Sequence, residues 1–186
     1  MIDGRPAVFL DRDGVLNEIR MDGESAASPR TLDEFHITPD AADSVQRLRT
    51  AGFEVVVITN QPDIARGLLD QVVVDAMHER LCTATDILNV EVCPHARGHG
   101  CPCRKPLPGM LHTASARLGL DLGSSWTVGD RWVDIAAGRA AGTRTVLVQR
   151  PWSWLSTSSG GPEPSLEPDV SVPDLADAVT VIVGSP

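Results

Sequence analysis

Three short apolar runs each lead directly into polar residues, and this repeated pattern constrains the fold more than any other feature of the chain. The runs and the residues that follow them are 7–10 with Asp11, 53–58 with Thr59 and Asn60, and 126–128 with Gly129 and Asp130. Short apolar runs bounded by turn residues are typical of buried strands. Because ligands bind beyond the carboxyl ends of parallel strands, we expect these polar residues to meet at one edge of a sheet.

Segments with helical spacing of apolar residues alternate with the strand-like runs. Helices are predicted at 39–51, 69–84, 108–118, 131–141 and 175–183, and further strands at 89–92, 143–148 and 169–172. Alternation of this kind indicates an α/β fold, a three-layer Rossmann-like sandwich around a mainly parallel central sheet.

The remaining segments leave no room for a large cap domain, and we expect one domain over 1–186. Residues 17–39 are mostly polar and predict a loop or flap, in which 18–29 lies where a substrate would be sensed. Ser, Gly and Pro dominate 151–168, which predicts a partly mobile surface loop. We expect Trp152 and Trp154 in this loop to pack on the core, with an oligomer contact as the alternative.

Composition and charge exclude several classes of function. The net charge of −9 argues against binding to a nucleic-acid backbone, which needs clustered Lys and Arg. No apolar run approaches the roughly 18 residues of a membrane span. The N-terminal stretch 1–5 lacks the charged lead and apolar core of a signal peptide, so we expect a cytoplasmic protein.

Four aspartates at the predicted strand ends indicate a site for a hard cation. Asp11 and Asp13 stand two residues apart and would repel each other unless a cation lay between them. Mg²⁺ prefers oxygen ligands and would also bind a phosphate. For the motif D-x-D-G alone, a solvated turn with helix-capping aspartates is the alternative. Asp130 and Asp134 follow a different strand and supply further carboxylates.

Polar and basic residues near the other strand ends suit a phosphoryl group. Thr59 and Asn60 offer a hydroxyl and an amide, and Lys105 offers the positive charge that phosphoryl transfer requires. Arg104 has a planar, forked guanidinium that suits a phosphate or hydroxyl of a substrate, with a surface salt bridge as the alternative. Together with the aspartates, these residues indicate phosphoryl-transfer chemistry.

Three of the four cysteines lie within the segment 93–103, in the spacing C-x-H-x5-C-x-C. Crowded cysteines without a secretion signal indicate a metal site rather than disulfides. Cys93, His95, Cys101 and Cys103 make a closed set of the kind that structural Zn²⁺ prefers. His95 is favoured over His99, because its spacing from Cys93 mirrors the spacing of the other two cysteines. A reduced, metal-free cluster is the alternative. The loop runs directly into Arg104 and Lys105, which we expect the ion to position.

These motifs together resemble the haloacid dehalogenase-like (HAD) phosphatase superfamily. Its first motif is matched by D-R-D-G-V at 11–15 and its second by I-T-N at 58–60. Its lysine is matched by Lys105, and its acidic last motif by G-D at 129–130 with Asp134. The matches occur in the family order over residues 7–148.

The resemblance implies a two-step mechanism. Asp11 would attack phosphorus and form an aspartyl-phosphate, and Asp13 would protonate the leaving oxygen and then activate the hydrolytic water. Mg²⁺ would be held by Asp11, Asp130 and the main-chain carbonyl of Asp13. The residues that would hold the phosphoryl group or substrate are Thr59, Asn60, Gln61, Arg104 and Lys105.

Two zinc-bearing branches of the superfamily share the pattern C-P-H…C-x-C-R-K-P seen at 93–106. One removes the 7-phosphate of D-glycero-D-manno-heptose 1,7-bisphosphate in the route to nucleotide-activated heptose, and the other hydrolyses histidinol phosphate. The stretch 59–67 is similar to the heptose branch, T-N-Q-S-G-I-A-R-G. We therefore expect a small phosphorylated sugar as the substrate and a monomeric enzyme, with histidinol phosphate or another small phosphate ester as the alternative.

The chain departs from the heptose branch at three places. Pro62 and Asp63 replace Ser-Gly in the second motif, residues 18–29 lack the usual Gly-Tyr-Val, and the cysteine loop is short. These departures leave a different sugar phosphate open as the substrate. A zinc-stabilised binding module and a phosphotransferase are the other hypotheses, but the presence of both Asp11 and Asp13 argues against the binding module.

Overall fold

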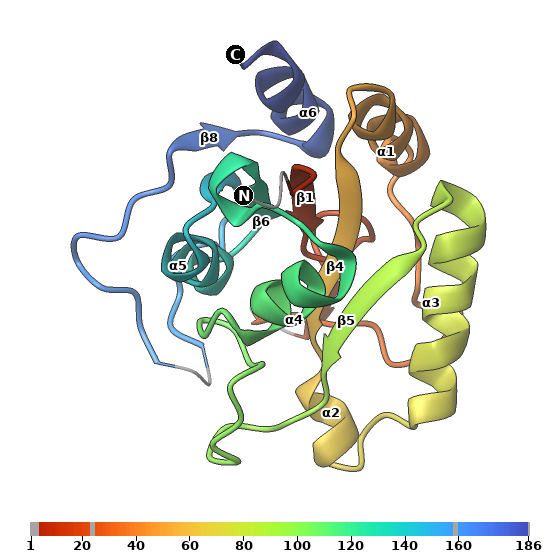
Figure 1. Ribbon diagram of the computed structural model, residues 1–186. Helices are drawn as coiled ribbons and strands as arrows, with labels where there is room; N and C mark the ends of the chain where they lie inside the picture. Colours follow the sequence, from red (N-terminus) through yellow and green to blue (C-terminus); the bar gives the residue numbers. More distant parts are fainter. Residues whose placement is uncertain (1–3, 23–24, 158–159, 186) are drawn as a thin grey trace.

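Six parallel strands form the central sheet of the protein. The computed structural model describes residues 4–22, 25–157 and 160–185. The strand order is β5-β4-β1-β6-β7-β8, and every neighbouring pair is parallel (Figure 1). The strands are β1 (Ala7–Leu10), β4 (Glu54–Asn60), β5 (Asn89–Cys93), β6 (Trp126–Gly129), β7 (Arg144–Val148) and β8 (Val170–Val172). The predicted mainly parallel sheet is confirmed.

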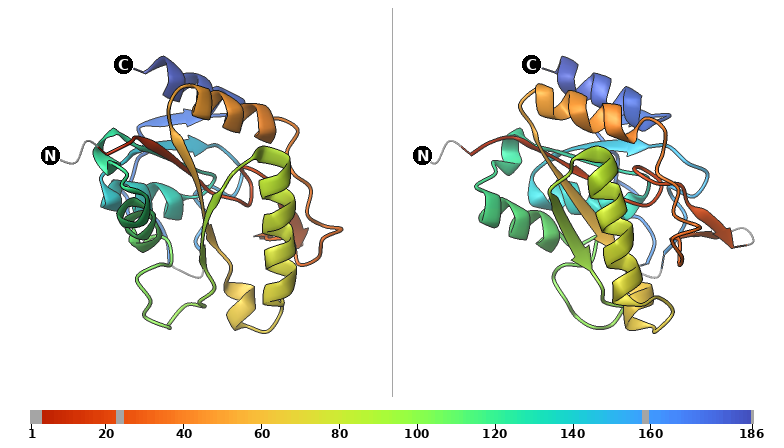
Figure 2. Two further views of the ribbon diagram at one scale, coloured as in Figure 1. Left: turned by 45° about the vertical axis from the view of Figure 1, so that its right-hand side comes forward. Right: turned by 90° about the vertical axis from the view of Figure 1, so that its right-hand side faces the viewer.

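Helices cover both faces of this sheet and complete the predicted three layers (Figures 1 and 2). One face carries α1 (Ala41–Thr50), α3 (Gln71–Thr85) and α6 (Leu175–Gly184). The other face carries α4 (Gly109–Leu118) and α5 (Trp132–Ala141). The short α2 (Pro62–Ala65) lies beyond the end of β4, where the sequence pattern did not predict a helix.

The alternation of side chains along β1 explains why both faces are covered. Val8 and Leu10 belong to the hydrophobic core under α1, α3 and α6, whereas Ala7 and Phe9 belong to the core under α4 and α5. All four side chains are fully buried. A strand that is apolar on both sides needs a helical layer on each face, which is why its sequence is a continuous apolar run.

The predicted flap contains a small antiparallel hairpin of β2 (Arg20–Asp22) and β3 (Ser25–Ala27). In Figure 2 this hairpin stands out from the body of the molecule. Residues 23–24, which belong to the predicted flap, lie outside the described residues. No helix among the described residues has the length and apolar character to cross a membrane.

The segment after β7 is an irregular surface loop over residues 151–157 that is hydrogen-bonded to the body of the protein. The main chain of Ser153 accepts a hydrogen bond from the Trp132 amide (2.9 Å), and the indole of Trp132 donates to the carbonyl of Leu155 (3.1 Å). These bonds fix the segment against the beginning of α5. Trp152 and Trp154 were expected to pack on the core, but Trp154 is 39% exposed and Trp152 lines a cavity. Residues 158–159 of the same loop lie outside the described residues.

Two leucines provide a matched test of the layered core. Leu81 of α3 is fully buried, and Leu88, which follows the helix, is 80% exposed. Leu81→Ala should lower the free energy of unfolding by about 2–5 kcal/mol through lost burial and a cavity. Leu88→Ala should change it by less than about 0.5 kcal/mol. Urea unfolding followed by circular dichroism measures both, and equal effects would contradict the assigned packing.

Candidate active site

Three carboxylates from two strand ends and one helix meet at the carboxyl edge of the sheet. Asp11 follows β1, Asp130 follows β6, and Asp134 lies in the first turn of α5. One oxygen of each lies within 4.8 Å of the others, and all three residues are buried. The expected meeting of strand ends β1 and β6 is thus observed, because parallel neighbours place these ends side by side.

A buried lysine lies between two of these carboxylates. The Nζ atom of Lys105 is 2.8 Å from Oδ1 of Asp11 and 2.6 Å from Oδ1 of Asp134. It also donates to the carbonyl of Ile58 in β4 (2.8 Å). Burial by itself lowers the pKa of Lys105, but the two carboxylates outweigh burial and raise the pKa above its ordinary value. Lys105 is therefore charged at neutral pH.

One lysine does not balance the negative charge of three carboxylates. Burial and the neighbouring Asp134 raise the pKa of Asp11 to about 7, against the lowering effect of Lys105. Burial, Asp11 and Asp134 raise the pKa of Asp130 well above its ordinary value. The Oδ1 atom of Asp130 is buried without a hydrogen-bond partner among the described residues. This donor set, all oxygen and short of positive charge, fits a hard divalent cation such as Mg²⁺.

Two glycines allow these carboxylates to approach so closely. A Cβ atom on Gly14 would lie 2.2 Å from Oδ2 of Asp130, and a Cβ atom on Gly129 would lie 2.2 Å from Cβ of Asp134. Gly14 also has a φ of +90°, in the left-handed region that favours glycine. The glycine of the D-R-D-G motif is thus required both by the turn and by the neighbouring carboxylate of Asp130.

The side chain of Asp13 lies apart from this group and accepts several hydrogen bonds. Its donors are Arg12, Asn17 (3.0 Å), Ser28 (2.7 Å) and Gln61 (2.8 Å). Burial by itself raises the pKa of Asp13, but the Arg12 guanidinium and these hydrogen bonds outweigh burial and lower the pKa. Asp13 is therefore a carboxylate that can accept a proton, and Ser28 connects it to the flap.

Arg12 and His78 are site residues that sequence reasoning missed. Arg12 is fully buried, and its guanidinium lies 5.3 Å from the ring centre of Phe35. Its NH1 atom is 3.0 Å from Nε2 of His78 in α3. Burial and the positive charge of Arg12 lower the pKa of His78 to about 4, so the neutral imidazole accepts this bond at pH 7. The spacing of apolar residues in α3 does not indicate a role for His78, because its partner Arg12 lies far away in the sequence.

Thr59 and Asn60 both make hydrogen bonds to other protein groups. Thr59 is 1% exposed, and its hydroxyl accepts a hydrogen bond from Gln61 (2.8 Å). Asn60 donates to the carbonyl of Lys105 and accepts from its amide, both at 3.1 Å. Asn60 and Gln61 also line a cavity that contains Asp11, Asp13 and Lys105 in its walls. Asn60 therefore also orients the segment that carries Lys105.

A cavity of about 490 Å³ opens above Asp11, Asp13 and Lys105. Residues 26–28 of the flap, residues 60–63 and the segment 155–157 form its walls. Four arginines also line it: Arg30, Arg66, Arg104 and Arg131. The cavity thus combines an acidic floor with a basic rim, although the whole chain is strongly acidic.

Asp63, which replaces a glycine of the resembled motif, connects two sides of this rim. Its Oδ2 atom is 2.7 Å from Nε of Arg30, which follows the flap hairpin, and its Oδ1 atom is 3.2 Å from NH1 of Arg66. The side chain of Asp63 is only 14% exposed. The departure seen in the sequence therefore forms an ion pair between α2 and the flap.

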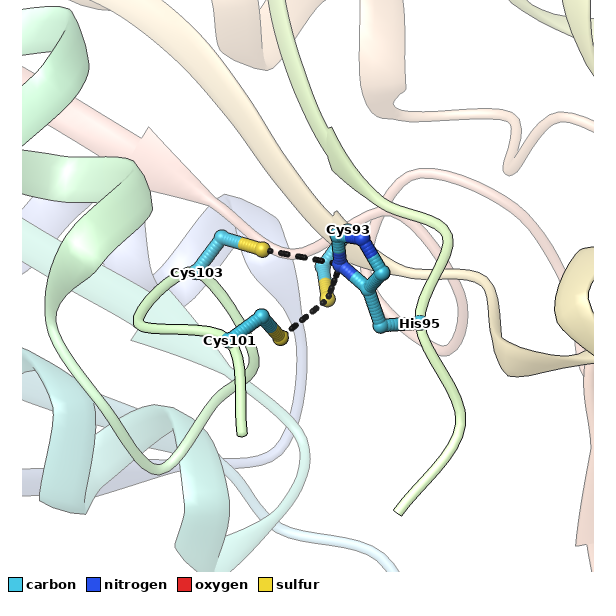
Figure 3. Close-up of side chains that lie close together, drawn as sticks. All are labelled: Cys93, His95, Cys101 and Cys103. Carbon is cyan, nitrogen blue, oxygen red and sulfur yellow. Dashed lines mark hydrogen bonds between the residues drawn. The ribbon is translucent and has the colours of Figure 1, made fainter. Parts of the chain in front are cut away.

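The cysteine loop gathers four potential ligand atoms beside the active site (Figure 3). Sγ of Cys93 lies 3.8 Å from Sγ of Cys101 and 3.7 Å from Nδ1 of His95, which lies 3.3 Å from Sγ of Cys103. Two sulfur atoms bound to one tetrahedral zinc ion are about 3.8 Å apart. His99 is not in this group, and its Nδ1 contacts the carbonyl of Ala96. The spacing of the group thus fits zinc.

Gly14 and Gly52 provide a matched pair for testing the close approach at Asp130. Both have φ near +90°, but no atom lies within 4 Å of a Cβ built on Gly52. Alanine at either position should cost about 1 kcal/mol through backbone strain. Gly14→Ala should lower the free energy of unfolding by about 1–3 kcal/mol more than Gly52→Ala, because its Cβ overlaps a buried carboxylate. Urea unfolding checks this, and equal losses for both variants would argue against the described contact.

Comparison with known proteins agrees with this geometry. The HAD-hydrolase-like family model matches residues 102–178. A Pseudomonas aeruginosa protein named D-glycero-beta-D-manno-heptose-1,7-bisphosphate 7-phosphatase is 42% identical over 150 residues, which cover 78% of this chain and 82% of that protein. A Photorhabdus laumondii protein, named as the phosphatase of the alpha form, is 35% identical over 146 residues, which cover 72% of this chain and 76% of that protein.

A solved structure shows the same fold. The crystal structure of D,D-heptose 1,7-bisphosphate phosphatase from B. bronchiseptica, complexed with magnesium and phosphate, has a TM-score of 0.78 and 33% sequence identity. The match covers 96% of this chain and 98% of that chain. The chain therefore belongs to the haloacid dehalogenase-like phosphatases, the family whose first motif follows β1 at residues 11–15.

Proposed function

We propose that the protein removes the 7-phosphate of D-glycero-D-manno-heptose 1,7-bisphosphate in the route to nucleotide-activated heptose. The observation that carries this proposal is the buried group of Asp11, Asp130 and Asp134 with Lys105, at the floor of an arginine-lined cavity. The printed names of its relatives support the substrate.

Asp11 is the proposed nucleophile. Its Oδ1 atom accepts a hydrogen bond from the Arg12 amide (2.7 Å) and pairs with Lys105, so two donors hold the carboxylate in one orientation. An oxygen of Asp11 bonds to phosphorus while the bond to the sugar oxygen breaks. Asp13, a carboxylate in the free site, would take up a proton from solvent when the phosphate binds and give it to that leaving oxygen. It would then take a proton from the water that hydrolyses the aspartyl-phosphate.

Asp11, Asp130 and the main-chain carbonyl of Asp13 would hold Mg²⁺, with Asp134 as a further acidic neighbour. When bound, the cation offsets the negative charge on the carboxylates and on the phosphoryl group. Lys105 adds a fixed positive charge beside Asp11. Thr59, Asn60 and Gln61 would contact phosphoryl oxygens or orient the groups that do so. Thr59 and Asn60 are already hydrogen-bonded to Gln61 and to the main chain of Lys105, respectively.

The basic rim of the cavity favours a second phosphate over a cationic group. Arg66 and Arg104 line the same cavity as Asp11. Burial lowers the pKa of Arg104, and the positive charge of Arg66 lowers it further. A sugar bisphosphate would bring a second anion to this rim. Histidinol phosphate carries an amino group that is positively charged at neutral pH, which these arginines would repel. The cavity volume also suits a small molecule.

Cys93, His95, Cys101 and Cys103 are proposed to hold a structural Zn²⁺. Burial raises the pKa of the Cys93 thiol to about 12, so a bound cation is needed to keep it as a thiolate at neutral pH. The ion would also fix Arg104 and Lys105, which follow Cys103 directly. Arg104 donates a hydrogen bond to the carbonyl of His95 (3.2 Å). The loop would thus support the active site without taking part in the chemistry.

All proposed ligands and catalytic groups come from one chain, so we propose a monomer of one domain over 1–186. A zinc site with three thiolates is stable where cysteines stay reduced, which supports a cytoplasmic location. Size-exclusion chromatography with light scattering tests the oligomeric state, and a stable dimer would contradict it.

Phosphate release from competing substrates tests the proposed function. With Mg²⁺, kcat/KM for heptose 1,7-bisphosphate should exceed that for histidinol phosphate by at least about tenfold, because the rim is basic. The alpha and beta anomers are assayed separately, since relatives carry both names. EDTA should abolish release. Preference for histidinol phosphate would overturn the substrate.

The Asp11→Asn variant is the control for the chemistry in this assay. It should lower kcat by more than about 1,000-fold while zinc content and the circular dichroism spectrum stay as in the parent. Substantial remaining turnover would show that Asp11 is not the nucleophile.

Cysteine-to-serine variants test the zinc loop. Cys101→Ser should lose stoichiometric zinc and lower Tm by more than about 5 °C, since roughly 2–4 °C corresponds to 1 kcal/mol in a chain of this size. Cys82, which lies outside the ligand group, provides the control, and Cys82→Ser should keep the zinc. Plasma emission spectroscopy and thermal unfolding measure these effects. A Cys101→Ser variant with full zinc content and unchanged Tm would contradict the structural role.

A further inference from the structure

The segment after β7 brings an indole to the acidic group at the sheet edge. Ser153 holds this segment in place, because its hydroxyl accepts from the Arg150 amide (2.8 Å) and its carbonyl accepts from the Trp132 amide. Within it, the Nε1 atom of Trp152 donates a hydrogen bond of 2.5 Å to Oδ2 of Asp130. The cavity therefore has a wall formed by a segment whose composition indicated only a surface loop.

The two oxygens of Asp130 have different surroundings. Oδ2 accepts from Trp152 and lies where a Cβ atom on Gly14 would be, 2.2 Å away. Oδ1 is buried and has no hydrogen-bond partner within the part of the chain that the structure describes. Asp130 contributes one of its oxygens to the carboxylate group with Asp11 and Asp134. One oxygen is thus occupied by protein, and the other remains available to a cation.

An indole is well suited to enforce this difference. Its N–H group only donates, so it bonds a carboxylate oxygen and cannot itself ligate a cation. Hydrogen bonds to the outer oxygen of a ligating carboxylate fix its orientation, and losing such a partner lowers metal affinity by about 10–100-fold in general. Without the indole, no side chain of the described residues would hold either oxygen of the fully buried Asp130.

We propose that Trp152 is a positioning residue for the catalytic cation. By donating to Oδ2 of Asp130, it orients the carboxylate and leaves Oδ1 available to the cation that Asp130 would hold together with Asp11. The inference rests on the proposed Mg²⁺ site but not on the identity of the sugar. It assigns a role to a residue of the Pro-Trp-Ser-Trp stretch that lies after all the family motifs.

Binding of Mg²⁺ alone tests this role. Isothermal calorimetry on the parent and on Trp152→Phe should show a dissociation constant for Mg²⁺ raised by about tenfold or more in the variant. Trp154→Phe is the matched control, because Trp154 is 39% exposed and lies two residues away. It should bind Mg²⁺ like the parent. The Mg²⁺ concentration for half-maximal activity should rise by a similar factor in Trp152→Phe and should stay as in the parent in Trp154→Phe.

A second substitution isolates the N–H group from the shape of the ring. Replacing Trp152 by 3-benzothienylalanine keeps a two-ring side chain and substitutes sulfur for the N–H donor. Because it fills the same space as the indole, this variant should fold even if Trp152→Phe does not. This variant should show the same loss of Mg²⁺ affinity. Parent-like affinity would overturn the inference while leaving the proposed function intact. A parent that binds no Mg²⁺ would overturn the metal site and the inference together.

Discussion

The ion pairs of Lys105 with Asp11 and Asp134 are the interaction on which the rest of the active end depends. Three carboxylates cannot remain buried and close together without positive charge, because water does not screen their repulsion there. Lys105 supplies part of that charge from a position that is 1% exposed. The raised pKa values of Asp11 and Asp130 show that the compensation is incomplete. The buried carboxylates therefore keep an excess of negative charge that a bound cation would offset.

Keeping Lys105 in place requires several elements at once. Its ammonium reaches the carbonyl of Ile58 in β4, and its main chain is held by the side chain of Asn60. On its N-terminal side, the cysteine loop ends at Cys103, two residues away. The cysteine loop therefore supports the site by fixing one end of a short segment whose other contacts come from the sheet. The loop, the second motif and the lysine therefore act as one structural unit.

The walls of the cavity, in contrast, come from segments that differ from the resembled branch. Asp63 pairs with Arg30 and Arg66, and thereby joins the flap to α2 by charge rather than by a separate cap domain. Arg131 makes a similar connection on the opposite side, since its NH2 atom donates to the carbonyl of Ala26 (2.9 Å). Ion pairs and hydrogen bonds between loops therefore join the walls of the cavity, whereas the buried carboxylates lie at the edge of the sheet.

The sequence by itself determined the fold class, the bounds of the six sheet strands and of the five longer helices within two residues, and the candidate carboxylates. It could do so because apolar periodicity and strand-end motifs are local signals, and parallel strands bring their carboxyl ends together. It did not predict α2 or the hairpin of β2 and β3. The roles of Arg12, His78 and Trp152 were decided only by tertiary structure. Each contacts a partner through a side chain whose reach depends on packing, as in the bond from Trp152 to Asp130, 22 residues away in the sequence. Such contacts leave no periodic pattern, because they arise only after the helices and the final loop have packed against the sheet.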